Sequence, residues 1–271
     1  MLTPPRRRAE PGRGVYLLPS LMTLGNLFCG YACIVHAMRG EYEIAALFIG
    51  FAMLLDVLDG RIARMTGGTS AFGLEFDSLA DMISFGMAPA ILTFSWGLQP
   101  LGRWGWAAGF IYVTGAAMRL ARFNIQSGTA DKKYFVGMPS PAAATVPAAT
   151  IFAYPAGLNN PYGSLAALAL VLVPGFLMVS TIRFRSFKTI DLQARRSYTV
   201  LMAVGLLIAA IFAEPRVVLV SLSYAYLVSA FVEMIVSRIR HRGSEPVATP
   251  AQLPPASQDL PPRVLEHRPR F

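Results

Sequence analysis

Long apolar segments dominate this sequence and limit what it can fold into. A helix needs about 20 mainly apolar residues to cross a lipid bilayer. Hydrophobic residues make up 54% of the 271 residues and charged residues only 14%, against about 25% charged residues in an ordinary soluble domain. The predicted spans are residues 16–38, 43–63, 78–98, 104–124, 140–158, 163–183, 198–213 and 215–237. We therefore expect an all-α fold, a polytopic membrane bundle of about eight transmembrane helices.

Basic residues are distributed unevenly between the segments that connect these spans. The net charge is +9, and with a cytoplasmic N-terminus 21 of the 24 Lys and Arg residues fall on the cytoplasmic side. This asymmetry is typical of membrane proteins, whose cytoplasmic loops are rich in Lys and Arg. We therefore expect both termini in the cytoplasm and no nucleic-acid partner.

Composition also separates the two ends of the chain from its centre. Residues 1–15 form a basic cytoplasmic segment, residues 16–242 the transmembrane domain that carries the chemistry, and residues 243–271 a Pro-rich tail. Because the tail is too polar to bury a core, we expect it to be disordered. In the first span, Cys29 and Cys33 are predicted to be core residues. Small and polar residues of the same span, Gly25, Asn26 and Gly30, are predicted to serve helix packing.

Four aspartates lie close together in the sequence. Asp56 and Asp59 share one helix face at the end of the second span, because residues three apart are neighbours on a helix. Asp77 and Asp81 share a face at the start of the third span for the same reason, being four residues apart. A connection of about a dozen residues would let the two helices run antiparallel. The four carboxylates should then meet at one depth, near the cytoplasmic surface.

Four carboxylates this close cannot all ionise without a counter-cation. Oxygen ligands favour a hard cation such as Mg²⁺ or Mn²⁺, and two such ions suit a displacement at phosphorus. The alternative is that the acids form ordinary loop salt bridges with Arg61 and Arg64. Two arginines, however, cannot neutralise four aspartates and Glu75. Glu75 lies off the face of Asp77, so we expect it to be solvated.

These residues fit the pattern D-x2-D-G-x2-A-R-x8-G-x3-D-x3-D over residues 56–81. The pattern resembles the signature of the CDP-alcohol phosphatidyltransferases. The resemblance implies an enzyme that transfers a phosphatidyl group from CDP-diacylglycerol to an alcohol and releases CMP. It implies that two divalent cations, Mg²⁺ or Mn²⁺, bind the four aspartates, and that Asp81 also acts as the general base. It further implies CDP-diacylglycerol contacts from Leu18, Pro19, Ser20, Leu21, Gly60, Arg64, Ser70 and Gly73.

Three further segments, residues 119–124, 135–142 and 182–188, resemble the phosphatidylserine synthase branch of this family. That resemblance implies L-serine as the acceptor. The serine carboxylate favours a guanidinium partner, and the candidates are Arg119, Arg122 and Arg183. Asn124 is a candidate for the amino group. Glycerol 3-phosphate, an inositol phosphate and choline remain alternative acceptors.

Two other classes of membrane protein use aspartates. Membrane prenyltransferases place their aspartate pairs in separate halves of the bundle, whereas all four lie in one window here. A cation transporter would favour acids near mid-span and an inverted repeat, and neither is found in the sequence. We expect an integral protein of a bacterial inner membrane that works among its lipids, with the active site facing the cytoplasm. The resemblance also implies a homodimer.

Overall fold

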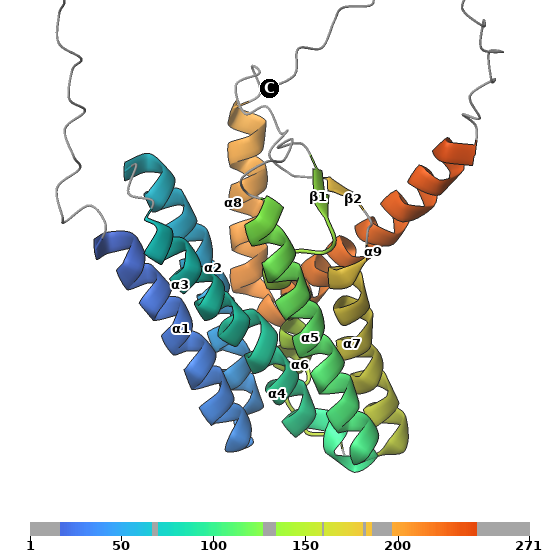
Figure 1. Ribbon diagram of the computed structural model, residues 1–271. Coiled ribbons are helices and arrows are strands. Elements are labelled where there is room, and N and C mark those ends of the chain that lie inside the picture. The colour runs from blue at the N-terminus through green and yellow to red at the C-terminus, as the bar shows by residue number, and fades with distance from the viewer. Residues whose placement is uncertain are drawn as a thin grey trace, which may run out of the picture.

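The computed structural model describes residues 17–66, 70–126, 134–158, 160–180, 183–185 and 197–242. Nearly all of these residues are helical (Figure 1). Each predicted span overlaps a helix, and the predicted N-terminal segment and C-terminal tail lie outside the described residues. The α-helices are α1 Leu17–Met38, α2 Tyr42–Thr66, α3 Ala71–Asp81, α4 Ala88–Thr93, α5 Arg103–Gln126, α6 Ser140–Ala153, α7 Pro161–Val179, α8 Ser197–Ala213 and α9 Pro215–Arg242.

The third predicted span lies in one long, continuous helical rod that contains two π-helical segments. The π-helical segment η2 (Met82–Met87) joins α3 to α4, and α4 continues through η3 (Phe94–Leu98) and η4 (Gln99–Leu101). The rod begins earlier than predicted because the Ser70 hydroxyl caps α3, accepting the Gly73 N–H at 2.9 Å. The second helix also runs on to Thr66, so the connection expected to hold about a dozen residues is only residues 67–70.

Small residues let the helices approach closely. A Cβ added to Gly30 of α1 would lie 2.5 Å from Ser84 Oγ and 2.8 Å from Ser84 Cα on η2. This confirms the predicted packing role of Gly30. Cys29 and Cys33 are both buried with free thiols, as predicted for core residues.

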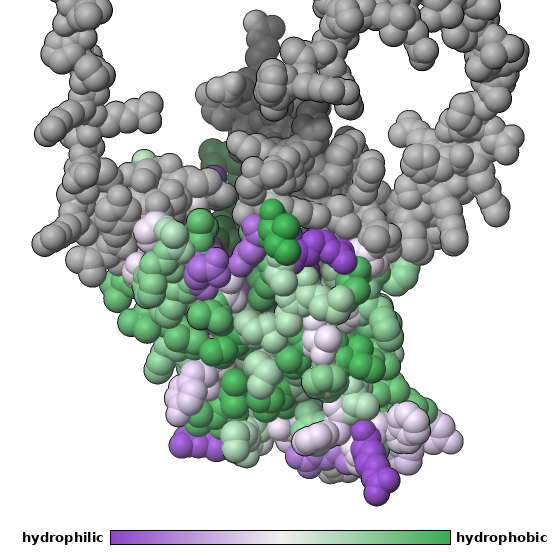
Figure 2. Space-filling model, viewed as in Figure 1, coloured by the Kyte–Doolittle hydropathy of each residue, from purple (hydrophilic) through white to green (hydrophobic). Residues whose placement is uncertain are grey.

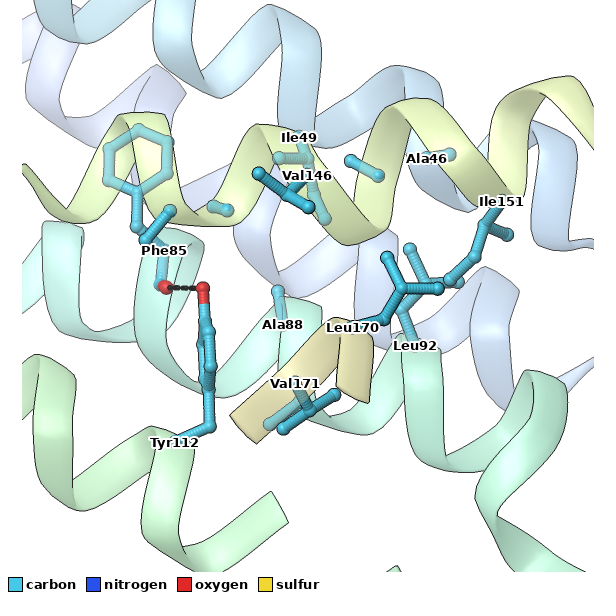
Figure 3. Packing of buried hydrophobic residues seen from close by; sticks show 14 of the residues in the cluster. Ala46, Ile49, Phe85, Ala88, Leu92, Tyr112, Val146, Ile151, Leu170 and Val171 are labelled. Atoms are coloured by element: carbon cyan, nitrogen blue, oxygen red, sulfur yellow. Dashed lines mark hydrogen bonds between the residues drawn. The ribbon is translucent and has the colours of Figure 1, made fainter. Parts of the chain in front are cut away.

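The centre of the bundle is apolar. Side chains from α2, η2, α4, α5, α6 and α7 meet there (Figure 3). The buried Tyr112 hydroxyl donates to the backbone carbonyl of Phe85 at 3.2 Å, which satisfies its polar group inside the core. The α5 helix is thereby fixed against η2, just beyond the aspartates of α3.

The surface supports an integral membrane protein. Figure 2 shows an apolar belt on the visible face, with polar residues at both ends of the described bundle. In the described part of the chain, three helical stretches are long and apolar enough to span a bilayer: Ser20–Met38, Ala71–Leu101 and Pro161–Val179. The helices α2 and α5 have similar lengths, 25 and 24 residues, but contain several charged residues. The number of eight spans and the orientation of the termini stay predictions.

A short antiparallel pair of strands, not predicted from the sequence, ties two connections together. Strand β1 (Tyr134–Val136) pairs with β2 (Arg183–Arg185), with Phe135 opposite Phe184. The chain then turns at Gly137, where φ is +87°, a conformation that glycine adopts readily. The Met138 N–H donates to the Leu177 carbonyl at 3.0 Å. The start of α6 is thus held at the end of α7.

Candidate active site

The structure brings three of the four aspartates together. Asp56 and Asp59 from α2 and Asp77 from α3 each offer a carboxylate oxygen, and these oxygens lie within 4.8 Å of one another. The prediction that the two aspartate pairs meet at one depth is therefore confirmed for these three. Asp59 is buried, and Asp56 and Asp77 are half-buried. Carboxylates this close repel one another unless a cation or a proton lies between them.

The surroundings of the three aspartates fit a divalent cation. Asp77 Oδ1 is buried and has no hydrogen-bond partner among the described residues. Across the described side chains, the ion pairs closer than 4.0 Å are His36–Glu41 and Arg216–Glu43, away from the aspartates. Arg61 is exposed, and Glu75 is exposed as predicted. A cluster of carboxylate oxygens is the donor set that Mg²⁺ and Mn²⁺ prefer.

Asp81 lies one helical turn beyond Asp77 and has different surroundings. Its side chain is only 8% exposed, and it is not one of the three aspartates grouped above. Asn26 of α1 donates a hydrogen bond from Nδ2 to Asp81 Oδ1 at 3.1 Å. The π-helical turn η2 begins at the next residue, and such turns are frequent at functional sites. Asp81 thus lies outside the group of three oxygens but still interacts electrostatically with Asp56 and Asp77.

A half-buried arginine lies beside this acidic site. Arg119 of α5 interacts electrostatically with Asp56 and Asp81. Its Nη1 donates to the buried Ser140 hydroxyl at the start of α6 at 2.7 Å. Its guanidinium carbon also lies 5.4 Å from the centre of the Phe123 ring. These contacts hold a positive charge next to the aspartates, where an anionic ligand would need one.

The other residues predicted to bind serine have different contacts. Arg122 donates from Nη1 to the Val179 carbonyl at 3.3 Å and so satisfies a backbone group at the end of α7. Asn124 of α5 donates from Nδ2 to Ser78 Oγ at 3.0 Å, so it contacts α3 at the residue that follows Asp77. Arg183 lies in β2, with its side chain outside the described residues. Among the described candidates, Arg119 is therefore best placed to contact a ligand at the aspartates.

The residues predicted to bind CDP-diacylglycerol lie along three elements. Gly60 follows Asp59 on α2, and Ser70 and Gly73 form the capped start of α3. Ser20 and Leu21 lie in the first turns of α1, and the Leu21 side chain is exposed. The side chains of Leu18, Pro19 and Arg64 fall outside the part of the chain that the structure describes.

Two site residues were missed by the sequence analysis. Thr23 of α1 donates from Oγ1 to Asp59 Oδ2 at 3.2 Å, three residues before Asn26, which donates to Asp81. Asn26 was predicted to serve helix packing, and it is indeed buried where α1 meets η2. Its hydrogen bond to a site carboxylate was not predicted. The available signal was two polar side chains at i,i+3 on one face of an apolar helix. Such residues inside a membrane helix need polar partners, because lipid offers none.

Comparison with known proteins places this geometry in a family. The CDP-alcohol phosphatidyltransferase profile matches residues 16–181, which include every aspartate of the site. The CDP-diacylglycerol–serine O-phosphatidyltransferase of Helicobacter pylori (strain J99) is 35% identical over 83% of this chain and 94% of its own length. The protein of the same name from Bacillus subtilis (strain 168) is 35% identical over 63% of this chain and 91% of its own length. The archaetidylserine synthase of Methanothermobacter thermautotrophicus is 36% identical, over 62% of this chain and 69% of that one. The chain belongs to the CDP-alcohol phosphatidyltransferase family.

Proposed function

We propose that this protein transfers the phosphatidyl group of CDP-diacylglycerol to L-serine, giving phosphatidylserine and CMP. The observation that carries the proposal is the meeting of Asp56, Asp59 and Asp77 within 4.8 Å, in the middle of the family match. Serine as the acceptor is supported by the Helicobacter and Bacillus relatives, which are both CDP-diacylglycerol–serine O-phosphatidyltransferases.

Asp56, Asp59 and Asp77 are proposed to hold divalent cations, Mg²⁺ or Mn²⁺, with Asp81 contributing to the second of two. Bound cations would neutralise charge on the diphosphate and on the departing CMP. The buried, unpartnered Asp77 Oδ1 fits this role, because a buried acceptor without a donor is costly.

Asp81 is proposed to act as the general base. A serine hydroxyl is a weak nucleophile until a base removes its proton. The serine oxygen forms a bond to the phosphorus of the phosphatidyl group, and the bond from that phosphorus to the CMP oxygen breaks. The hydroxyl proton passes to Asp81, and CMP leaves with the bonding electrons. Asp81 lies outside the group of three oxygens and accepts a hydrogen bond from Asn26, which suits a residue with a task different from that of its neighbours.

Arg119 is proposed to bind the serine carboxylate. A guanidinium can pair with a carboxylate through two parallel hydrogen bonds, and the half-buried Arg119 interacts electrostatically with Asp56 and Asp81. Arg122 is a weaker candidate, since it already donates to a backbone carbonyl of α7. Asn124 stays a candidate for the amino group, as does Arg183 for the carboxylate. On the nucleotide side, the proposed contacts are Leu18, Pro19, Ser20, Leu21, Gly60, Arg64, Ser70 and Gly73.

The setting of the enzyme also remains a proposal. We place the protein in a bacterial inner membrane as a homodimer of eight-span subunits, with both termini and the site on the cytoplasmic side. Figure 1 supports the common location of the site residues, since α2, α5 and α7 end and α1 and α3 begin at the same end of the bundle. A lipid substrate in the leaflet and a soluble alcohol could both reach that end.

Release of CMP tests the function directly. Purified protein is given CDP-diacylglycerol and Mn²⁺ or Mg²⁺, with L-serine, glycerol 3-phosphate, an inositol phosphate or choline in separate reactions. We expect release with L-serine alone, and loss of release in Asp81→Asn. Arg119→Gln should raise the KM for serine more than Arg122→Gln does. Release with a different alcohol only would overturn the serine assignment and keep the family chemistry. If folded, metal-bound protein releases no CMP with any of these alcohols, the proposed reaction is contradicted and a cation transporter is favoured.

A further inference from the structure

Helix α1 contributes two buried polar side chains to the site, each directed at a different carboxylate. Thr23 Oγ1 donates to Asp59 Oδ2 at 3.2 Å, and Asn26 Nδ2 donates to Asp81 Oδ1 at 3.1 Å. Both side chains are almost fully buried, with relative exposures of 5% for Thr23 and 0% for Asn26. One face of α1 thus hydrogen-bonds both Asp59, a member of the group of three, and Asp81.

The geometry fixes the orientation of the Asn26 amide. An ionised carboxylate only accepts hydrogen bonds, so the amide nitrogen must be the atom that faces Asp81. The other amide atom, Asn26 Oδ1, is buried without a hydrogen-bond partner in the described part of the chain. A buried acceptor left unsatisfied destabilises a fold. Asn26 is therefore poorly explained as a packing residue, and its bond to Asp81 is the contact that gives it a role.

The backbone around Asn26 is held against η2. The Ser84 hydroxyl of η2 donates to the Asn26 carbonyl at 2.9 Å. One turn further along α1, Gly30 allows η2 to approach closely, because any Cβ there would meet Ser84. The contact between α1 and η2 therefore sets the position of Asn26 relative to Asp81, which directly precedes η2.

We propose that Thr23 and Asn26 are positioning residues that divide their work, Thr23 orienting Asp59 as a cation ligand and Asn26 orienting Asp81 as the base. The inference rests on the roles proposed above for these two aspartates. Residues that hydrogen-bond a metal ligand typically change metal affinity or activity by about 10–100-fold when removed. The division predicts that the two losses are separable, because each donor contacts one carboxylate.

Two near-isosteric variants separate the roles. Thr23→Val should weaken Mn²⁺ binding to the substrate-free protein by about 10-fold or more, and excess Mn²⁺ should restore most of its turnover. Thr23→Ser keeps the hydroxyl and should bind Mn²⁺ like the wild type. Asn26→Leu should lower kcat by about 10-fold or more, with the KM for CDP-diacylglycerol and the Mn²⁺ affinity of the site formed by Asp56, Asp59 and Asp77 within about twofold of wild type.

Thr93→Val is the matched control. Thr93 is as buried as Thr23, but its hydroxyl donates to the Pro89 carbonyl of its own helix. The control should bind Mn²⁺ and turn over like the wild type. Thermal unfolding in detergent identifies variants that have lost the fold.

The proposal is overturned if folded Thr23→Val binds Mn²⁺ normally, or if Asn26→Leu loses Mn²⁺ as strongly as it loses turnover. In the second case Asn26 would act on cation binding, directly or through Asp81, and not on the base. The measurement uses whichever alcohol gives CMP release, so failure of serine as the acceptor leaves this test intact.

Discussion

The first seven helices and the last two have different surroundings. Between α1 and α7, polar side chains such as Asp59, Asn26 and Ser84 are buried and hydrogen-bonded across helices. In α8, every residue from position 201 to 209 is exposed, although most of them are apolar. The first region must therefore keep particular side chains at particular places. The second needs only to be apolar where it meets lipid.

Helix α9 is intermediate between these two regions. It packs along α6, where the hydroxyls of Tyr224 and Thr150 lie 3.2 Å apart. Near its start, Arg216 pairs with Glu43 of α2 at 2.7 Å, and both side chains are about half exposed. The family match ends at residue 181, before α8 begins. We therefore expect the effect of a substitution on activity or stability to decrease from the aspartates, through α9, to α8.

The largest effect is expected at the aspartates. Asp77→Asn keeps the size of the side chain and removes a charge from the proposed cation site, so turnover should fall by at least about 100-fold. CMP release and Mn²⁺ binding measure the change. Glu75→Gln, two residues away on an exposed side chain, is the control and should retain full activity. Equal loss in both variants would show that negative charge in this region, not the cluster itself, is what the protein needs.

The second-largest effect is expected where α1 meets η2. Gly30→Ala should lower the free energy of unfolding by about 1–3 kcal/mol, because its Cβ would lie 2.8 Å from the Ser84 backbone. Gly50→Ala in α2 is the matched control, since a Cβ at that position meets nothing within 4 Å. Alanine favours a helix more than glycine does, so the control should be neutral or slightly stabilising. Thermal unfolding in detergent compares the two. Similar melting temperatures would contradict the close approach of α1 and η2.

A smaller effect is expected between α9 and α2. Arg216→Gln removes the pair with Glu43, and an exposed ion pair contributes about 0–1 kcal/mol. Unfolding measured at low and high salt should show a small loss that disappears when salt screens the charges. A loss well above that range would mean that α9 is anchored as firmly as the helices of the first region.

The smallest effect is expected in α8. Phe212 is 86% exposed, so Phe212→Ala should change stability by less than about 0.5 kcal/mol and leave CMP release unchanged. A clear loss of activity or of the oligomeric state would show that α8 contacts a partner subunit. The difference between the two regions would then have to be redrawn.

The sequence predicted the helices and the aspartate site for different reasons. Helix positions followed from runs of apolar residues, which are long enough in this chain to be located without a structure. The approach of Asp56, Asp59 and Asp77 followed from helical spacing and an antiparallel turn. Neither kind of reasoning could place Thr23 and Asn26, because their partners lie 36 and 55 residues away in the sequence.

The same limit applied to other contacts between distant segments. The β1–β2 pair joins two connections that carry no strand-like alternation long enough to be noticed. The early start of α3 depends on one hydroxyl, Ser70, which the sequence analysis assigned to ligand binding and which also caps the helix. The β1–β2 pairing depends on a contact between distant segments. The Ser70 cap joins residues only three apart, and a serine before a helix is itself a signal in the local sequence.

Anomalous scattering from Mn²⁺ in a structure of the metal-bound protein would test the central claim most directly. The account predicts a peak between α2 and α3, at about 2.0–2.3 Å from carboxylate oxygens of Asp56, Asp59 and Asp77, as oxygen ligation of such ions requires. The peak should vanish in Asp77→Asn while the helices stay in place. A peak elsewhere in the bundle, or none at Mn²⁺ concentrations that support CMP release, would contradict the assignment of this cluster as the active site.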